Sequence, residues 1–65
     1  MADQERDVYF EHIVIGATVK VAAIDSLTAT EVSITGPANA PRAQLQQVAL
    51  QKLKARLARD QAGNP

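Results

Sequence analysis

The segment ITGPANAPRAQL, residues 34–45, divides the chain into two parts with different hydrophobic periods. Before it, apolar residues form short alternating or β-branched runs, which are typical of strands. After it, leucines and alanines recur every three or four residues, as on one face of a helix. Pro37 and Pro41 remove backbone donors and push the residues before them away from helical geometry. We therefore expect strands first, a helix last, and a stiff corner between them.

The first part of the chain predicts a hairpin. Two β-like runs, Val8 to Ile15 and Thr18 to Asp25, flank Gly16-Ala17. Glycine adopts positive φ without strain, which a two-residue hairpin turn demands. The pattern therefore predicts two antiparallel strands joined directly at this glycine.

A third strand is predicted from Thr30 to Thr35, after the turn Asp25-Ser26-Leu27-Thr28-Ala29. The aspartate can bond back to the turn backbone, and the residue before the strand often lies in the left-handed region. At Ala29 that geometry would cost roughly 1 kcal/mol, because the residue carries a Cβ.

The helix is predicted from Ala40 to Gln61, with Asn39 as the N-cap and Pro41 in the first turn. Its apolar face consists of Leu45, Ala49, Leu50, Leu53 and Leu57, with Val48 at the margin.

These elements predict an α+β fold, in which a three-stranded antiparallel β-meander is followed by one C-terminal α-helix packed on one face (βββα). We expect a single small domain over residues 1–65, with an ordered core of about residues 7–60 and flexible polar ends at 1–6 and 61–65. The predicted core is Val8, Phe10, Val14, Val19, Val21, Val32, Ile34, Leu45, Ala49, Leu53 and Leu57.

Composition excludes several kinds of site. The chain has 65 residues, no cysteine and one histidine, so it forms no disulfide, no thiolate metal site and no multi-histidine metal site. The first residues are acidic and polar, unlike a secretory leader, and the apolar runs are too short to span a bilayer. We expect a cytoplasmic protein that contacts no membrane and carries no cofactor.

The Pro-rich corner is expected to be a connector. A phosphate cradle needs several free N–H groups, and GPANAP offers two prolines, one glycine and no nearby lysine.

The stretches VYFEHIVIGATVKVAAID, TATEVSITGPANAP and ALQKL resemble a family of short bacterial proteins of unknown function. In that family a glycine usually stands at the position of Ala29, and an apolar or aromatic residue at that of His12.

Some members of the resembling family carry a transferred label of serine hydroxymethyltransferase. That reaction needs pyridoxal phosphate on a lysine, a phosphate site and a folate pocket. A chain of 65 residues with one helix cannot alone enclose a cavity for these ligands. We also expect all three lysines outside the corner to be exposed, namely Lys20, Lys52 and Lys54. His12 lacks an adjacent carboxylate on its strand face, because Glu11 points to the opposite face. We therefore expect a protein that is not an enzyme.

The sheet face opposite the helix is a candidate protein interface. Alternation places Tyr9, Ile13 and Ile15 there, and Ile24 as well unless a bulge turns it inward. Apolar side chains gathered on an open face indicate an interaction site. We predict a non-catalytic interaction module or accessory protein, which binds an unidentified protein partner or forms a weak homodimer.

Nucleic-acid binding is the alternative. Residues 1–36 carry six acidic and two basic side chains, a balance of −4, and residues 37–65 carry five basic and one acidic, a balance of +4. Lys52, Arg56 and Arg59 share one helical flank and are the candidate phosphate contacts. An acidic front packed on a basic back weakens any long-range attraction for nucleic acid.

Overall fold

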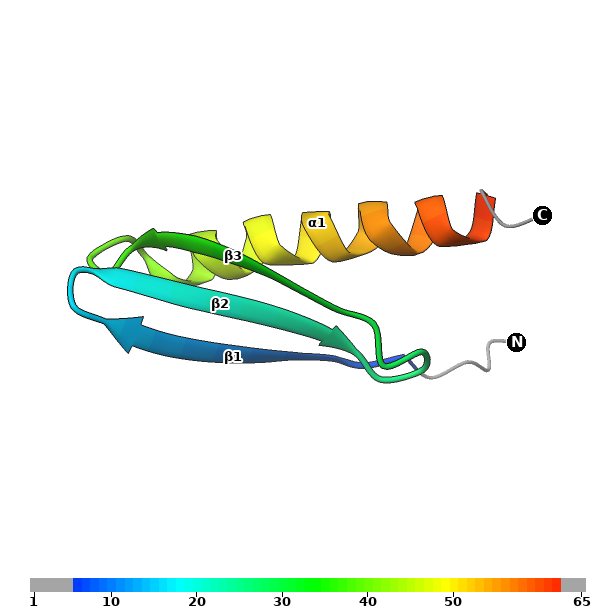
Figure 1. Cartoon of the computed structure of the whole chain (residues 1–65), viewed down its shortest axis with the longest axis horizontal. Helices are drawn as coiled ribbons and strands as arrows, with labels where there is room; N and C mark the ends of the chain where they lie inside the picture. The colour runs from blue at the N-terminus through cyan, green and yellow to red at the C-terminus, as the bar shows by residue number, and fades with distance from the viewer. Residues whose placement is uncertain (1–5, 63–65) are drawn as a thin grey trace.

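The computed structural model describes residues 6–62, which form three strands and one helix. The elements in chain order are β1 (Val8–Ile15), β2 (Thr18–Asp25), β3 (Glu31–Pro37) and α1 (Arg42–Ala62). The strands form one antiparallel sheet in the order β1-β2-β3, and the helix covers one of its faces (Figure 1). The predicted α+β fold is confirmed. Of the predicted flexible ends, 1–6 and 61–65, residues 1–5 and 63–65 lie outside the described residues, whereas Gln61 and Ala62 belong to the helix.

The strand register runs without a slip through both pairs. β1 pairs with β2 from Val8 opposite Asp25 to Ile15 opposite Thr18, and β2 pairs with β3 from Thr18 opposite Pro37 to Ile24 opposite Glu31. Gly16 has φ of 62°, and Ala17 does not have a positive φ. Glycine in the first central position alone fits a type II′ turn, whose twist matches that of the flanking strands.

The core lies between α1 and the strands β2 and β3. Its buried members are Val19, Val21, Ala23, Val32, Leu45, Ala49 and Leu53, and the side chains packed around them are Val8, Phe10, Ile34, Ala40 and Leu57. The helix approaches β3 closely at Gly36, where an added Cβ would lie 2.8 Å from a terminal methyl carbon of Leu45. Within the described residues, no helix is long and apolar enough to cross a membrane.

The core prediction is wrong for Val14, which is 61% exposed. Val14 lies on the helix-side face, because the residue opposite it on β2 is the buried Val19. The helix, however, packs on β2 and β3 and leaves this end of β1 uncovered. Ala23, absent from the predicted core, is fully buried under the helix on the central strand.

The predicted N-cap is also wrong. The first helical bonds run from the N–H groups of Gln44 and Leu45 to the carbonyl of Pro41, at 3.1 and 3.2 Å. Pro41 therefore takes the capping position itself, and the helix begins at Arg42. Asn39 lies in the turn before it, where the N–H of Ala40 donates to the carbonyl of Pro37 at 3.0 Å.

The turn between β2 and β3 places Ala29 in the left-handed region, with φ of 62°. The N–H of Ala29 donates to the carbonyl of Asp25 at 2.8 Å, and the N–H of Asp25 donates to the carbonyl of Thr30 at 2.9 Å. The loop is closed by these two bonds, so Ala29 cannot relax its φ without losing one of them.

We expect Ala29→Gly to stabilise the protein by roughly 1 kcal/mol, since glycine adopts this conformation without a Cβ clash. Urea unfolding followed by circular dichroism measures the change. Ala38→Gly is the matched control, because Ala38 is an exposed loop alanine that does not have a positive φ. A lower urea midpoint for Ala29→Gly than for the unmodified protein would contradict the strain assigned to this residue.

Candidate protein-interaction surface

The open backbone edge of the sheet belongs to β1, which pairs with β2 on one side only. The carbonyl of Asp7 accepts a bond from the N–H of Ser26 at 3.0 Å, so the backbone of Asp7 is directed toward β2. In an antiparallel pair the direction alternates from residue to residue. The odd-numbered residues of β1 therefore bond to β2, and Val8, Phe10, His12 and Val14 direct their N–H and C=O groups away from the sheet.

Exposed apolar side chains accompany this edge on both faces. Tyr9, Ile13 and Ile15 are 57%, 45% and 68% exposed on the face opposite the helix, and Val14 is exposed on the helix side. We call this set the β1 surface: the outward backbone of Phe10, His12 and Val14 with the side chains of Tyr9, Ile13, Val14 and Ile15. Such an edge invites pairing with another chain.

Ile24, the fourth predicted interface residue, lies opposite Tyr9 across the β1–β2 pair and so shares its face. Its side chain is partly buried, so it contributes less surface than the three residues of β1. Ala22 lies on the same face yet is buried, because it is small and stands between Glu11 and Ser33 on the flanking strands. The far face is therefore apolar mainly along β1.

His12 lies at the middle of β1 on the helix-side face, opposite Val21. Its ring is half buried, and Nε2 is buried without a hydrogen-bond partner among the described residues. Glu11 lies opposite Ala22 and therefore on the other face, as expected. A general base needs a partner that orients its ring, and none of the described side chains bonds to this one.

The other edge of the sheet, on β3, is blocked at two points. Lys52 reaches from α1 and donates its Nζ to the carbonyl of Ser33 at 2.8 Å. Ser33 lies opposite Ala22, whose backbone bonds to β1, so the carbonyl of Ser33 faces outward. Pro37 at the end of the strand has no N–H to offer. Lysine and proline are residues with which natural sheets protect an edge.

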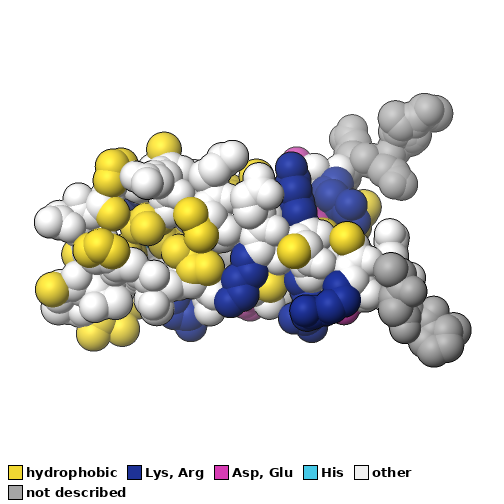
Figure 2. Space-filling model, turned by 90° about the horizontal axis from the view of Figure 1, so that it is seen from above, with side chains coloured by type: hydrophobic (Ala, Val, Ile, Leu, Met, Phe, Trp, Pro, Cys, Tyr) yellow, Lys and Arg dark blue, Asp and Glu magenta, His cyan; other side chains and the backbone are white. Residues whose placement is uncertain are grey.

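The three predicted nucleic-acid contacts come together on α1. Lys52, Arg56 and Arg59 line a small hollow of about 140 Å³ together with Val32 and Ala55. Lysines and arginines gather over the half of the molecule that contains the helix C-terminus, whereas hydrophobic side chains gather over the other half (Figure 2).

Two of these cations already have partners. Lys52 bonds to the strand edge, and the Nε of Arg56 lies 3.2 Å from a carboxylate oxygen of Asp60, one helical turn away. Binding a phosphate would compete with both contacts.

A buried carboxylate holds the other end of the sheet. Asp25 is fully buried, and its Oδ2 accepts bonds from the hydroxyl of Thr28 at 2.7 Å and from the N–H of Thr28 at 3.0 Å. The Nε of Arg6 lies 2.7 Å from Oδ1. That contact is an ion pair whose alignment does not make a hydrogen bond, because Oδ1 has no well-directed donor among the described residues.

The hydrogen bond from the Thr28 hydroxyl lowers the pKa of Asp25 below its ordinary value of 3.8. Burial opposes this shift, while the N–H of Thr28 and the charge of Arg6 add to it. The carboxylate therefore stays ionised and locks the β2–β3 turn. The sequence analysis expected Asp25 to bond to its turn but not to pair with Arg6, which it placed in the flexible end.

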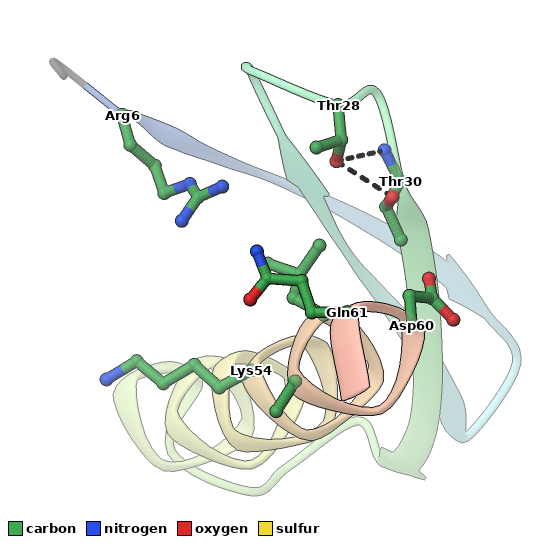
Figure 3. A pocket seen from close by; sticks show the side chains of 8 residues that line it. Arg6, Thr28, Thr30, Lys54, Asp60 and Gln61 are labelled. Atoms are coloured by element: carbon green, nitrogen blue, oxygen red, sulfur yellow. Dashed lines mark hydrogen bonds between the residues drawn. The ribbon is translucent and has the colours of Figure 1, made fainter. Parts of the chain in front are cut away.

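An open cleft of about 460 Å³ lies between this turn and the end of the helix. Its lining residues are Arg6, Thr28, Thr30, Lys54, Leu57, Ala58, Asp60 and Gln61. The Arg6 guanidinium and the Gln61 amide point into the same space, while Lys54 extends away from the two threonines, which bond to each other (Figure 3). Arg6 is held by Asp25, and His12 does not line the cleft.

No group of three or more His, Cys, Asp or Glu side chains within residues 6–62 gathers as a metal site. Among known proteins, residues 5–60 match one family, described as Domain of unknown function (DUF6898). The match agrees with the resemblance to proteins of unknown function. No curated protein and no solved structure matches the chain.

Proposed function

The chain belongs to the DUF6898 family, whose description gives no activity, and we propose that it is a non-catalytic protein-interaction module that binds through the β1 surface. The mode of binding is strand addition, in which an extended segment of the partner pairs with the outward groups of Phe10, His12 and Val14. The exposed side chains of β1 then supply the selectivity.

The difference between the two sheet edges carries this proposal. β3 has Lys52 and Pro37 on its edge, whereas β1 has apolar side chains on both faces. A protein that only had to avoid aggregation would protect both edges. The exposed edge of β1, which has Glu11 but no lysine or proline, is therefore the surface that a partner covers.

The proposal assigns no catalytic role. The serine hydroxymethyltransferase label of the resembling proteins is not part of it, because the cleft at the helix end is open and its arginine is engaged by Asp25. Lys54, the one lysine of that cleft, is exposed, and a lysine that holds pyridoxal phosphate lies in an enclosed site.

A pull-down with three baits tests the proposal: the unmodified chain, Val14→Lys and Val48→Lys. Val48 is 50% exposed on α1, so its substitution adds the same lysine at a similarly exposed valine away from β1. We expect proteins retained by the unmodified chain and by Val48→Lys to be lost from Val14→Lys. The same protein set on all three baits would contradict binding through β1.

Nucleic-acid binding through Lys52, Arg56 and Arg59 is the competing function, and the gathering of these residues around one hollow favours it. Titration with short duplex RNA and DNA at low salt, followed by NMR, separates the two functions. Salt-sensitive shifts at these three residues would support the competing function, because phosphate contacts weaken steeply as salt rises. Unchanged spectra at low salt would end it.

A further inference from the structure

We propose that the partner of the β1 surface is a second copy of this chain, paired antiparallel through β1 with His12 of each copy opposite His12 of the other. The two three-stranded sheets then form one sheet of six strands. The inference rests on the proposed function, because it names the partner that the β1 surface takes.

Symmetry limits how two identical edges can pair. Two antiparallel copies of one strand are related by a two-fold axis perpendicular to the sheet, so the residue on the axis faces itself. Both helices then lie on the same side of the combined sheet. Since the helix packs on β2 and β3, the two helices stay on either side of the joined β1 strands.

Of the three central registers, with the axis at Glu11, His12 or Ile13, the axis at His12 pairs Tyr9, Phe10, Val14 and Ile15 with apolar residues and places Glu11 opposite Ile13. Residues at equal distances from His12 become partners, so Tyr9 faces Ile15 and Phe10 faces Val14 of the second copy. Aromatic side chains opposite β-branched ones are favourable cross-strand pairs. The exposed residues Tyr9, Val14 and Ile15 thus all gain an apolar partner.

The two neighbouring registers pair the strands less well. An axis at Glu11 places two glutamates directly opposite each other, which is destabilising. An axis at Ile13 places Glu11 against Ile15 and leaves Tyr9 beyond the paired segment. In the Glu11 register Ile15, the most exposed of these side chains, has no apolar partner, and in the Ile13 register neither Tyr9 nor Ile15 has one within the strand.

The backbone and the ring of His12 fit the register. The even-numbered residues of β1 direct their N–H and C=O groups outward, so Phe10 with Val14 and His12 with His12 are hydrogen-bonded pairs. On the axis, the rings of the two His12 residues lie side by side. The buried Nε2, which has no partner among the described residues, then meets a second ring nitrogen that can exchange a hydrogen bond with it.

Analytical ultracentrifugation from micromolar to millimolar concentration tests the partner. One pair of short strands buries less surface than the roughly 800 Å² that each partner buries in a standard complex. We therefore expect dimers that dissociate on dilution. Val14→Lys should weaken the dimer by about tenfold or more, because a lysine on the paired edge opposes pairing. Val48→Lys should leave the dissociation constant unchanged, and circular dichroism verifies that both variants are folded.

Single-cysteine variants test the register, since the chain has no cysteine of its own. Under mild oxidation at millimolar protein, His12→Cys should form a disulfide-linked dimer, because Cα atoms of a hydrogen-bonded pair are about 5.5 Å apart. Ile13→Cys should not, since its Cα atoms would be diagonal neighbours about 7–8 Å apart. The reverse result would overturn the His12 register.

The outcomes separate this inference from the proposed function. A monomer at millimolar concentration overturns the second copy as partner, even if the pull-down still loses proteins with Val14→Lys. A dimer that Val14→Lys leaves intact also overturns it, because the contact is then elsewhere. If neither self-association nor protein capture depends on Val14, the proposed function fails as well.

Discussion

Leu53→Ala is expected to remove most of the free energy of unfolding at 25 °C. Leu53 is the largest fully buried hydrophobic side chain of the described structure and lies at the centre of the contact between helix and sheet. Truncating a buried leucine to alanine costs about 2–5 kcal/mol, through lost burial and the cavity that remains. A domain of this size rarely has more than about 3–5 kcal/mol of net stability. The single substitution therefore removes most of the stability.

Circular dichroism without denaturant measures the effect, and urea titration of the unmodified protein sets the scale. The matched control is Val48→Ala, on the same helix but half exposed, which should change the free energy of unfolding by less than about 1 kcal/mol. If Leu53→Ala unfolds at the same urea concentration as this control, the helix does not pack on the sheet in the way described.

Acidification is expected to destabilise the fold through Asp25. Its pKa is lowered in the folded state, chiefly by the hydroxyl of Thr28, so the folded protein holds this proton less tightly than the unfolded chain does. The stabilisation is therefore fully present above the ordinary value of 3.8 and is lost as the pH falls through the lower folded value. Urea midpoints measured from pH 7 down to pH 2 should decline most steeply in this acidic range.

Asp25→Asn tests whether this carboxylate causes the decline. The variant should be less stable than the unmodified protein at pH 7, because it loses the charge that faces Arg6, and its acid decline should be shallower. Asp60→Asn is the control. Asp60 is about half exposed in its pair with Arg56, and such a pair is worth at most about 1 kcal/mol. An acid decline as steep in Asp25→Asn as in the unmodified protein would assign the titration to another group.

The ends of β1 and β2 could be predicted from sequence because they coincide with local chemical signals. Gly16 allows the hairpin turn, and the two runs around it begin and end at the predicted residues. β3 extends through Pro37, two residues beyond the prediction, since a proline on the outward side of an edge strand costs no sheet bond. Local turn chemistry was sufficient to place the ends of β1 and β2, but not those of β3.

Features that depend on where the helix lies could not be predicted. Alternation correctly places Val14 on the helix-side face, but periodicity does not say which strands a single helix covers. The same limit applies to Arg6 and Asp25, which are 19 residues apart and meet only because β1 and β2 pair. No local pattern links them.

The candidate surface likewise has features that could be predicted from the sequence and features that depend on tertiary packing. The exposure of Tyr9, Ile13 and Ile15 follows from alternation and from the edge position of β1. The partial burial of Ile24, which lies opposite Tyr9 on β1 and Glu31 on β3, does not follow from alternation alone. The protection of β3 by Lys52 was not predicted, because the sequence pattern indicated that this lysine is a solvent-exposed helix residue. The contrast between the two edges, on which the proposed function depends, could therefore be recognised only from the three-dimensional structure.

The blocked edge of β3 also limits the number of subunits that can assemble. A subunit with two open edges could add copies at both edges without limit, as in a fibril. A subunit with one open edge can pair with one other copy only. When two copies join through β1, the outermost strands of the product are both β3, each with Lys52 on Ser33 and with Pro37 at its end. Assembly then stops at two, and a scattering mass that rose beyond twice that of the monomer would show that the β3 edge is open after all.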